Sequence, residues 1–189
     1  AGYRISEAAE IVQSHPAPSL PDPEEHGNAG MDRLRESLKQ CLLAFDRGGA
    51  DRLITRLVDL SFIERLDQIF LPLAHEIGLG WEEGTVSVAQ EHFASGWARE
   101  QLFVMMSALR NTRANAMIAV CATPSGDRHE FGILAVSIRL ALRGWQVVYL
   151  GVDARPEAVA GAILAAKPDL VAASIVLERD ADIVTTWVQ

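Results

Sequence analysis

The sequence predicts an α/β protein in two parts, a bundle of four helices followed by a parallel sheet covered by helices. Apolar residues recur at helical spacing up to about residue 110, and short apolar runs alternate with helical segments after that point. Hydrophobic residues make up 49% of the 189 residues, but aromatic residues only 6%. This composition favours helices and buried parallel strands over a β-sandwich.

Four helices are expected between Met31 and about Arg110. Their apolar stripes span residues 34–45, 53–60, 62–77 and 88–109. The glycines at 48–49 are expected to end the first helix and those at 78–80 to break the third, because glycine interrupts helices. Short links between such helices predict a compact bundle, which we place at residues 31–112.

Residues 113–189 alternate strands with helices. Strands are expected at 117–121, 146–150 and 170–176, and helices at 131–142, at 156–166 and from Asp180 onward. Apolar strands joined by helices imply a parallel sheet with both faces covered, as in flavodoxin-like and Rossmann-like domains. Three strands are few for such a sheet, so we expect the C-terminal part of this domain to be missing.

Charge and cysteine usage limit the classes of function. The net charge of −8 argues against a large nucleic-acid surface on this chain. Cys41 and Cys121 lie in apolar runs and are predicted to be buried, free thiols of a reducing compartment. No run approaches the roughly 18 apolar residues of a membrane span. We therefore expect a cytoplasmic protein without membrane association.

Residues 14–30 are predicted to be a linker. Four prolines alternate there with small and acidic residues, a composition typical of a semi-extended segment without a core. His15 and His26 lie in this segment and are interpreted as solvated side chains rather than metal ligands.

The loop after the first expected strand carries Asp127, His129 and Gly132. In sheets of this kind, ligands bind beyond the carboxyl ends of the strands. A carboxylate that accepts one imidazole N–H makes the other ring nitrogen more basic, which suits a metal ligand. No second His or Cys is close, so a metal here would have to bring its own ligands, as a corrin ring does. A purely structural role for His129 at the start of a helix fits the spacing equally well.

A second group of polar residues follows Trp81, at the start of the fourth helix. Helical spacing places four residues on one face: Val88, Glu91, His92 and Ser95. A carboxylate and an imidazole among small apolar residues are unusual for a core, although a polar rim of the bundle is the favoured interpretation of this segment alone. Trp97 and Trp145 are interpreted as packing residues without polar partners.

Together, the two groups resemble the cobalamin-binding domains that combine a helical cap with an α/β base. Residues 127–132 fit the signature Asp-x-His-x-x-Gly of those domains, and residues 174–176 fit their Ser-x-Leu/Val element. Within that superfamily the chain is most similar to the light-sensing, MerR-type transcriptional regulators of the CarH/LitR kind. Those regulators have a Trp followed, after nine residues, by Glu-His, as Trp81, Glu91 and His92 are arranged here. They also share the run Thr-Pro-x-Gly-x-x-His-Glu-x-Gly at residues 123–132.

The resemblance implies a role for each of these residues. His129 is the lower axial ligand of cobalt with Asp127 behind it, and Gly132 and Ser174 line the slot for the cofactor's nucleotide tail. Residues that cover the upper face are Trp81, Val88, Glu91 and, as a further contact, His92. The implied cofactor is adenosylcobalamin, with methylcobalamin or hydroxocobalamin as alternatives.

The resemblance also implies partners. Arg128 and Asp153 match a charged pair that joins two such domains head to tail, so we expect a homo-oligomer, either a dimer or a tetramer. Residues 1–13 are similar to the end of a winged helix-turn-helix, so DNA binding would reside in a domain largely upstream of this sequence. The implied protein is not an enzyme, but a regulator in which photolysis of the upper ligand changes oligomerisation and DNA binding.

One position departs from that family, and three alternative interpretations compete with the regulator. Glu82 directly follows Trp81, where those photoreceptors can have a His that captures cobalt after illumination. A carboxylate is a poorer partner than imidazole for cobalt(III), and His92 is the candidate substitute for that His. A corrinoid methyl-carrier subunit would share cap, base and His129. An antirepressor would bind a regulator protein instead of DNA. A flavodoxin-like domain without cobalamin is the simplest alternative.

Overall fold

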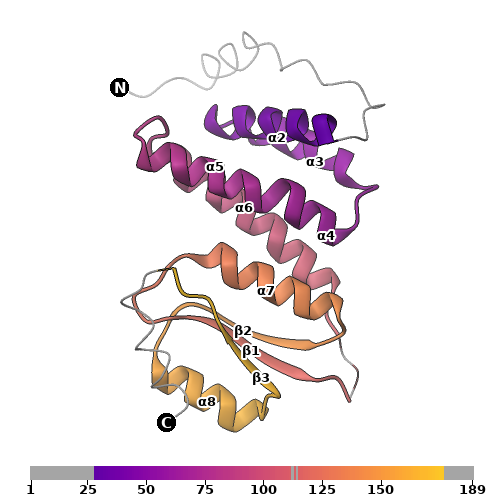
Figure 1. Ribbon diagram of the computed structural model, residues 1–189, viewed down its shortest axis with the longest axis vertical. Helices are drawn as coiled ribbons and strands as arrows, with labels where there is room; N and C mark the ends of the chain where they lie inside the picture. Colours follow the sequence, from indigo (N-terminus) through magenta and orange to yellow (C-terminus); the bar gives the residue numbers. More distant parts are fainter. Residues whose placement is uncertain (1–27, 112, 114, 177–189) are drawn as a thin grey trace, which may run out of the picture.

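The computed structural model describes residues 28–111, 113 and 115–176. The predicted winged-helix remnant at 1–13, the linker up to residue 27 and the helix from Asp180 lie outside the described residues. The described chain forms stacked layers, with a helical bundle above α7, then a sheet, then α8 (Figure 1). The predicted fold class, helices followed by a parallel sheet, is confirmed.

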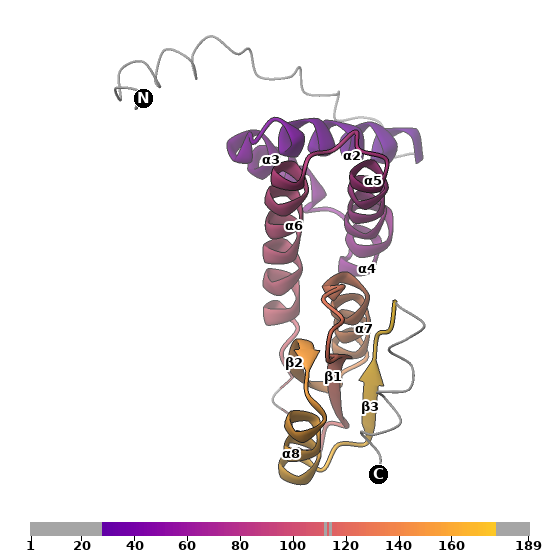
Figure 2. The same cartoon turned by 90° about the vertical axis from the view of Figure 1, so that its left-hand side faces the viewer.

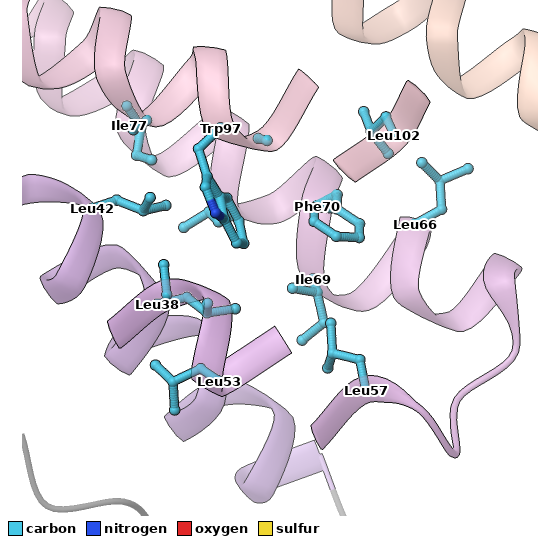
Figure 3. Packing of buried hydrophobic residues seen from close by; sticks show 14 of the residues in the cluster. Leu38, Leu42, Leu53, Leu57, Leu66, Ile69, Phe70, Ile77, Trp97 and Leu102 are labelled. Carbon is cyan, nitrogen blue, oxygen red and sulfur yellow. The ribbon is translucent and has the colours of Figure 1, made fainter. Parts of the chain in front are cut away.

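The bundle consists of α2 (Asn28–Leu43), α3 (Arg47–Ile54) with the 3₁₀ turn η1 (Thr55–Leu57), a rod formed by α4, η2 and α5, and α6 (Val88–Ala108). Its apolar stripes meet in one core (Figure 3), whose largest members include Leu38, Leu42, Leu57, Leu66, Ile69, Phe70, Ile77, Trp97 and Leu102. The packing role predicted for Trp97 holds, since this residue is 2% exposed. However, its indole N–H has a polar partner, because it donates to Asp51 Oδ1 at 2.8 Å.

Glycines fall inside helices where the sequence predicted breaks. Gly49 lies in the first turn of α3, and a Cβ there would come within 2.9 Å of Cys41 Sγ. Gly80 lies within α5 (Leu71–Glu82), and a Cβ there would come within 2.6 Å of Val86 Cγ2. These glycines permit close approach between segments rather than ending helices. The first helix begins at Asn28, inside the predicted linker. The prediction placed its start later because residues 28–30 show no apolar periodicity.

The rod combines α4 (Phe62–Glu64), η2 (Arg65–Phe70, a π-helical turn) and α5. Pro72 has no N–H, so the carbonyl of Gln68, four residues earlier, lacks its usual helical donor. Arg35 Nη1 from α2 donates to that carbonyl at 3.2 Å. A side chain of a neighbouring helix thus replaces the missing backbone hydrogen bond.

Glu76 of α5 ties the rod to α2 a second time. Its carboxylate accepts from Arg35 Nε at 2.7 Å and from Lys39 Nζ at 2.9 Å. Burial opposes the charge, but the hydrogen bonds from Lys39 and Arg35 prevail and hold the pKa of Glu76 below its usual value.

The sheet has three parallel strands in the order β2-β1-β3: β1 (Ile118–Pro124), β2 (Gln146–Ala154) and β3 (Leu170–Ala173). Six of the seven residues of β1 are buried, as expected for a central strand. Helix α7 (Glu130–Leu142) covers the face toward the bundle and α8 (Pro156–Ala166) the opposite face (Figures 1 and 2). The first two strands run past their predicted ends, because β1 and β2 pair as far as Pro124 and Ala154. β3 ends three residues before the predicted Val176.

The bundle and the sheet share α7. Leu134, Ala135 and Ile138 of α7 belong to the bundle core, whereas Ile133 packs with strand residues. Two ion pairs link α7 to the bundle, one between Arg99 and Glu130 and one between Asp67 and Arg139. α7 therefore lies between the two parts (Figure 2), which also contact each other directly where Phe103 of α6 meets Tyr149 of β2.

Candidate functional site

His129 stands at the carboxyl end of the sheet, as the N-cap residue of α7. Its Nδ1 lies 2.7 Å from Asp127 Oδ1, and the same oxygen accepts from the backbone N–H of His129 at 2.8 Å. With Asp127 accepting at Nδ1, Nε2 is the ring nitrogen that can act as a ligand. The His129 side chain is 56% exposed, so the imidazole is open to a large partner.

Asp127 is fully buried beneath His129. Besides the two bonds from His129, its Oδ2 accepts from the N–H of Val176 at 3.2 Å. Burial would raise the pKa of this carboxyl, but the backbone and ring hydrogen bonds of His129 and the bond from Val176 hold it below its usual value. Asp127 is therefore ionised at neutral pH and fixes the orientation of the imidazole.

Gly132 and Ser174 lie side by side, the first in the opening turn of α7 and the second just after β3. A Cβ on Gly132 would overlap Ser174 Oγ. Any larger residue at 132 would therefore have to displace the Ser174 side chain. The sequence prediction placed these two residues in one slot, and the structure brings them together.

Arg128 and Asp153, the predicted charged pair, differ in their surroundings. Arg128 is exposed on the loop between β1 and α7. The Asp153 carboxylate accepts from the N–H of Gly126 at 2.8 Å and from Ser125 Oγ at 3.3 Å. Asp153 thus has partners in its own chain, and its head-to-tail role stays a prediction.

The cap residues lie at the hairpin between α5 and α6. Ser87 forms a capping box with Gln90 and starts α6. Trp81 and Val88 are 49% and 56% exposed, which is unusual for large apolar side chains near each other in sequence. They therefore leave an apolar surface uncovered in the described chain.

Glu91 and His92 follow Val88 on the exposed side of α6. Glu91 Oε2 lies 2.5 Å from His92 Nδ1, and Glu91 Oε1 accepts from Ser95 Oγ at 2.7 Å. Burial opposes ionisation, but the bonds from Ser95 and His92 hold the pKa of Glu91 below its usual value. Glu91 is thus an oriented, ionised acceptor beside the exposed apolar surface.

The α5–α6 hairpin and the carboxyl ends of β1 and β2 lie on the same side of the molecule, at the left of Figure 1. In the part of the chain that the structure describes, no hydrogen bond joins Glu91 or His92 to His129. An electrostatic connection runs through Arg99, which acts on Glu91 and pairs with Glu130, the neighbour of His129. Within the described residues, the two predicted groups thus face one side of the molecule without a hydrogen bond between these side chains.

Sequence reasoning assigned no role to three residues at this junction, although one of them, Glu130, lies in the motif at residues 123–132. Arg99, Glu130 and Tyr149 meet there, with Tyr149 Oη donating to Glu130 Oε1 at 2.9 Å. Burial and the neighbouring Glu130 raise the pKa of Tyr149, so its hydroxyl stays protonated. Arg99 lies eight residues after Glu91 on α6, a helical spacing that could have been noticed. Tyr149 lies on β2, and no spacing in the sequence relates it to Arg99 or Glu130.

The donor set fits a metal that arrives with its own ligands. Across the described residues, no group of three or more His, Cys, Asp or Glu side chains could hold a bare ion. His129 offers one nitrogen, and the exposed Gly132 lies three residues further on, packed closely against Ser174. This arrangement suits a corrinoid, whose ring supplies the equatorial ligands of cobalt.

Comparison with known proteins defines the class. Two family models match the chain, each described as a B12 binding domain, one over residues 34–104 and the other over residues 117–189. The chain therefore belongs to the B12-binding domain family, with the first match on the bundle and the second on the α/β part. In the described residues, no helix is long and apolar enough to cross a membrane.

Two curated proteins are similar to almost the whole of this chain. The chain is 34% identical to the HTH-type transcriptional repressor CarA of Myxococcus xanthus over 94% of its own length and 57% of that protein. It is 31% identical to the HTH-type transcriptional repressor CarH of the same organism, over 96% of its own length and 62% of that protein. The chain is thus homologous to these repressors and spans about three fifths of their length.

A solved structure supports the fold. The monomethylamine corrinoid protein of Methanosarcina barkeri superposes with a TM-score of 0.62 at 19% identity, over 79% of this chain and 72% of that one. At this identity the likeness shows a shared fold of helical bundle and sheet.

Proposed function

We propose that this chain is the cobalamin-binding, light-sensing part of a transcriptional regulator. The observation that carries the proposal is the exposed imidazole of His129, which a buried carboxylate holds near the close approach of Gly132 to Ser174. Homology to the CarA and CarH repressors favours regulation over enzymatic turnover. The buried, free thiols of Cys41 and Cys121 are in keeping with the reducing cytoplasm.

In this proposal, His129 Nε2 would hold the cobalt of the cofactor, and Asp127 would fix the tautomer of the imidazole. Gly132 and Ser174 leave room for the nucleotide tail. On the upper side, Trp81 and Val88 supply apolar contact. Glu91 accepts hydrogen bonds from the hydroxyl groups of the upper ligand, and His92 lies beside it.

When bound, adenosylcobalamin supplies a cobalt–carbon bond that light breaks. The response of the chain follows from the loss of contacts at Trp81, Val88 and Glu91. The bundle then shifts over α7, and the association of copies through Arg128 and Asp153 changes. This is a two-state element biased by one ligand. DNA binding would change in turn, through a winged helix-turn-helix preceding this chain.

The test uses purified protein loaded with adenosylcobalamin in the dark. Its elution volume in gel filtration should change after green illumination, and absorption spectra should change with it. Methylcobalamin-loaded protein serves as a comparison for the upper ligand. An elution volume that light leaves unchanged would contradict light-dependent assembly. Transfer of the methyl group from the methylcobalamin-loaded protein to a thiol would indicate a carrier instead.

A further inference from the structure

Thr123 lies near the end of β1, fully buried, and its hydroxyl uses both of its hydrogen-bonding functions. Thr123 Oγ1 donates to the backbone carbonyl of Asp127 at 2.6 Å. The same oxygen accepts from the N–H of Asp153 at 3.1 Å. One hydroxyl therefore joins the loop that carries His129 to the end of β2.

Asp153 contacts the same loop through its backbone and its side chain. Its N–H also approaches the Asp127 carbonyl, at 3.1 Å, and its carboxylate accepts from the N–H of Gly126 and from Ser125 Oγ. Asp153 has a φ of 56°, a left-handed conformation that non-glycine residues rarely adopt and that Asp and Asn tolerate better than most. Such a conformation persists when the surrounding contacts hold it.

The loop between β1 and α7 is thus fixed from two strands. Thr123 holds the Asp127 carbonyl from β1, and Asp153 holds Gly126 and Asp127 from β2. The Asp127 side chain then reaches His129. A change at position 153 would therefore reach the imidazole through the backbone of Asp127, without any contact between Asp153 and His129.

We propose that Thr123 and Asp153 are positioning residues that hold the loop in the shape in which His129 can ligate cobalt. The inference rests on the proposed function, because it takes His129 as the axial ligand. It also gives Asp153 a role within one chain, distinct from pairing with Arg128 of a second copy. That distinction makes the inference testable, since the two roles require different properties of the side chain.

Two pairs of variants separate these properties. Asp153→Asn keeps an acceptor oxygen and tolerance of the left-handed conformation but loses the charge, whereas Asp153→Gly keeps the conformation and loses the acceptor. Thr123→Val removes the hydroxyl, and Thr123→Ser retains it. Far-UV circular dichroism checks that each variant folds.

Two readouts are needed. In the full chain, prepared with 15N-labelled histidine and loaded with cob(II)alamin, electron paramagnetic resonance shows whether a histidine nitrogen is bound. A bound 15N splits each cobalt line into two, whereas the 14N of the cofactor's own base splits it into three, and the two-fold splitting is the axial nitrogen signal that is scored. In the unloaded protein, amide hydrogen exchange reports how firmly residues 124–130 are held. Asp153→Gly and Thr123→Val should each lower the ratio of nitrogen-bound to unbound cobalt, and speed loop exchange, by about tenfold. Asp153→Asn and Thr123→Ser should resemble the wild type in both.

The inference is overturned if Asp153→Gly and Thr123→Val leave loop exchange and the axial nitrogen signal unchanged. Equal loss in Asp153→Asn and Asp153→Gly would also overturn it, because charge pairing with Arg128 would then explain both. An absent nitrogen signal in the loaded wild type would refute His129 as the ligand, and with it the proposed function. In that case the exchange of the unloaded variants still decides whether Thr123 and Asp153 hold the loop.

Discussion

Glu130 connects the bundle to the sheet, and removing either of its partners should destabilise the protein measurably. Its side chain is 12% exposed and contacts Arg99 of α6 and Tyr149 of β2. In Tyr149→Phe, the carboxylate loses one donor without loss of ring packing. In Arg99→Met, the carboxylate keeps the tyrosine but loses its cation. Both changes act on one charged group, so their effects should not add.

The magnitudes follow from burial. A hydrogen bond to a charged group contributes about 1.5–3 kcal/mol, so Tyr149→Phe should lower the free energy of unfolding by about 2 kcal/mol. Removing one partner of a buried ion pair costs about 3–5 kcal/mol. Arg99 is 42% exposed, and water weakens its pairing. We therefore expect about 1–2 kcal/mol for Arg99→Met, between the values for exposed and for buried ion pairs.

Urea denaturation followed by circular dichroism measures these changes. The matched control is the double variant Arg99→Met with Glu130→Gln, since a neutral amide needs no cation and can still accept from Tyr149. This variant should regain most of the stability lost in Arg99→Met alone. A change below about 0.5 kcal/mol in Tyr149→Phe, or no recovery in the double variant, would show that Glu130 is not the group that these partners stabilise.

Three further changes test the site and the bundle. Asp127→Asn should weaken cobalt ligation by His129 about 10–100-fold, as judged by titration of the nitrogen-bound form, and unchanged ligation would refute the role of the carboxylate. Gly132→Ala should raise the Kd for cobalamin about tenfold, because the added methyl group would displace Ser174. The gain in helix propensity should keep the free energy of unfolding within about 1 kcal/mol of the wild-type value. Equal binding by the variant and the wild type would show that the cofactor does not use this position. Glu76→Gln should destabilise the bundle by about 1 kcal/mol at neutral pH. Because folding lowers the pKa of Glu76, this difference is fully present above the unfolded pKa of about 4.3 and disappears as pH falls through the lower folded value, so a difference that persists at pH 2 would contradict the assignment.

Much of the fold was predictable because periodicity reports burial directly. The stripes of the bundle and the apolar run of β1 appear in the core as expected. Helix boundaries were less predictable, because a glycine such as Gly49 or Gly80 can either end a helix or allow close packing, and the residue type alone does not distinguish these roles. Only the neighbouring segments decide which of the two occurs.

The site shows the same limit. Asp127 and His129 are two residues apart, so their pairing could be predicted from sequence. Asp153 contacts the same loop from β2, which follows α7 in the chain. Its left-handed backbone conformation could not be predicted from any local sequence pattern. Contacts of this kind depend on strand order, which juxtaposes residues far apart in sequence.

Helix α6 runs without interruption from the capping box at Ser87 to Ala108. Its 21 residues correspond to a helix about 30 Å long. Glu91 lies in the first turn, Arg99 near the middle and Phe103 beyond it, where the Phe103 ring meets Tyr149 with 5.6 Å between ring centroids. Phe103 lies about 18 Å beyond Glu91 along α6, so a tilt of about 5° about the first turn would move the Phe103 ring by about 1.6 Å relative to Tyr149. An adjustment near Glu91 would thus change the contact between the bundle and the sheet.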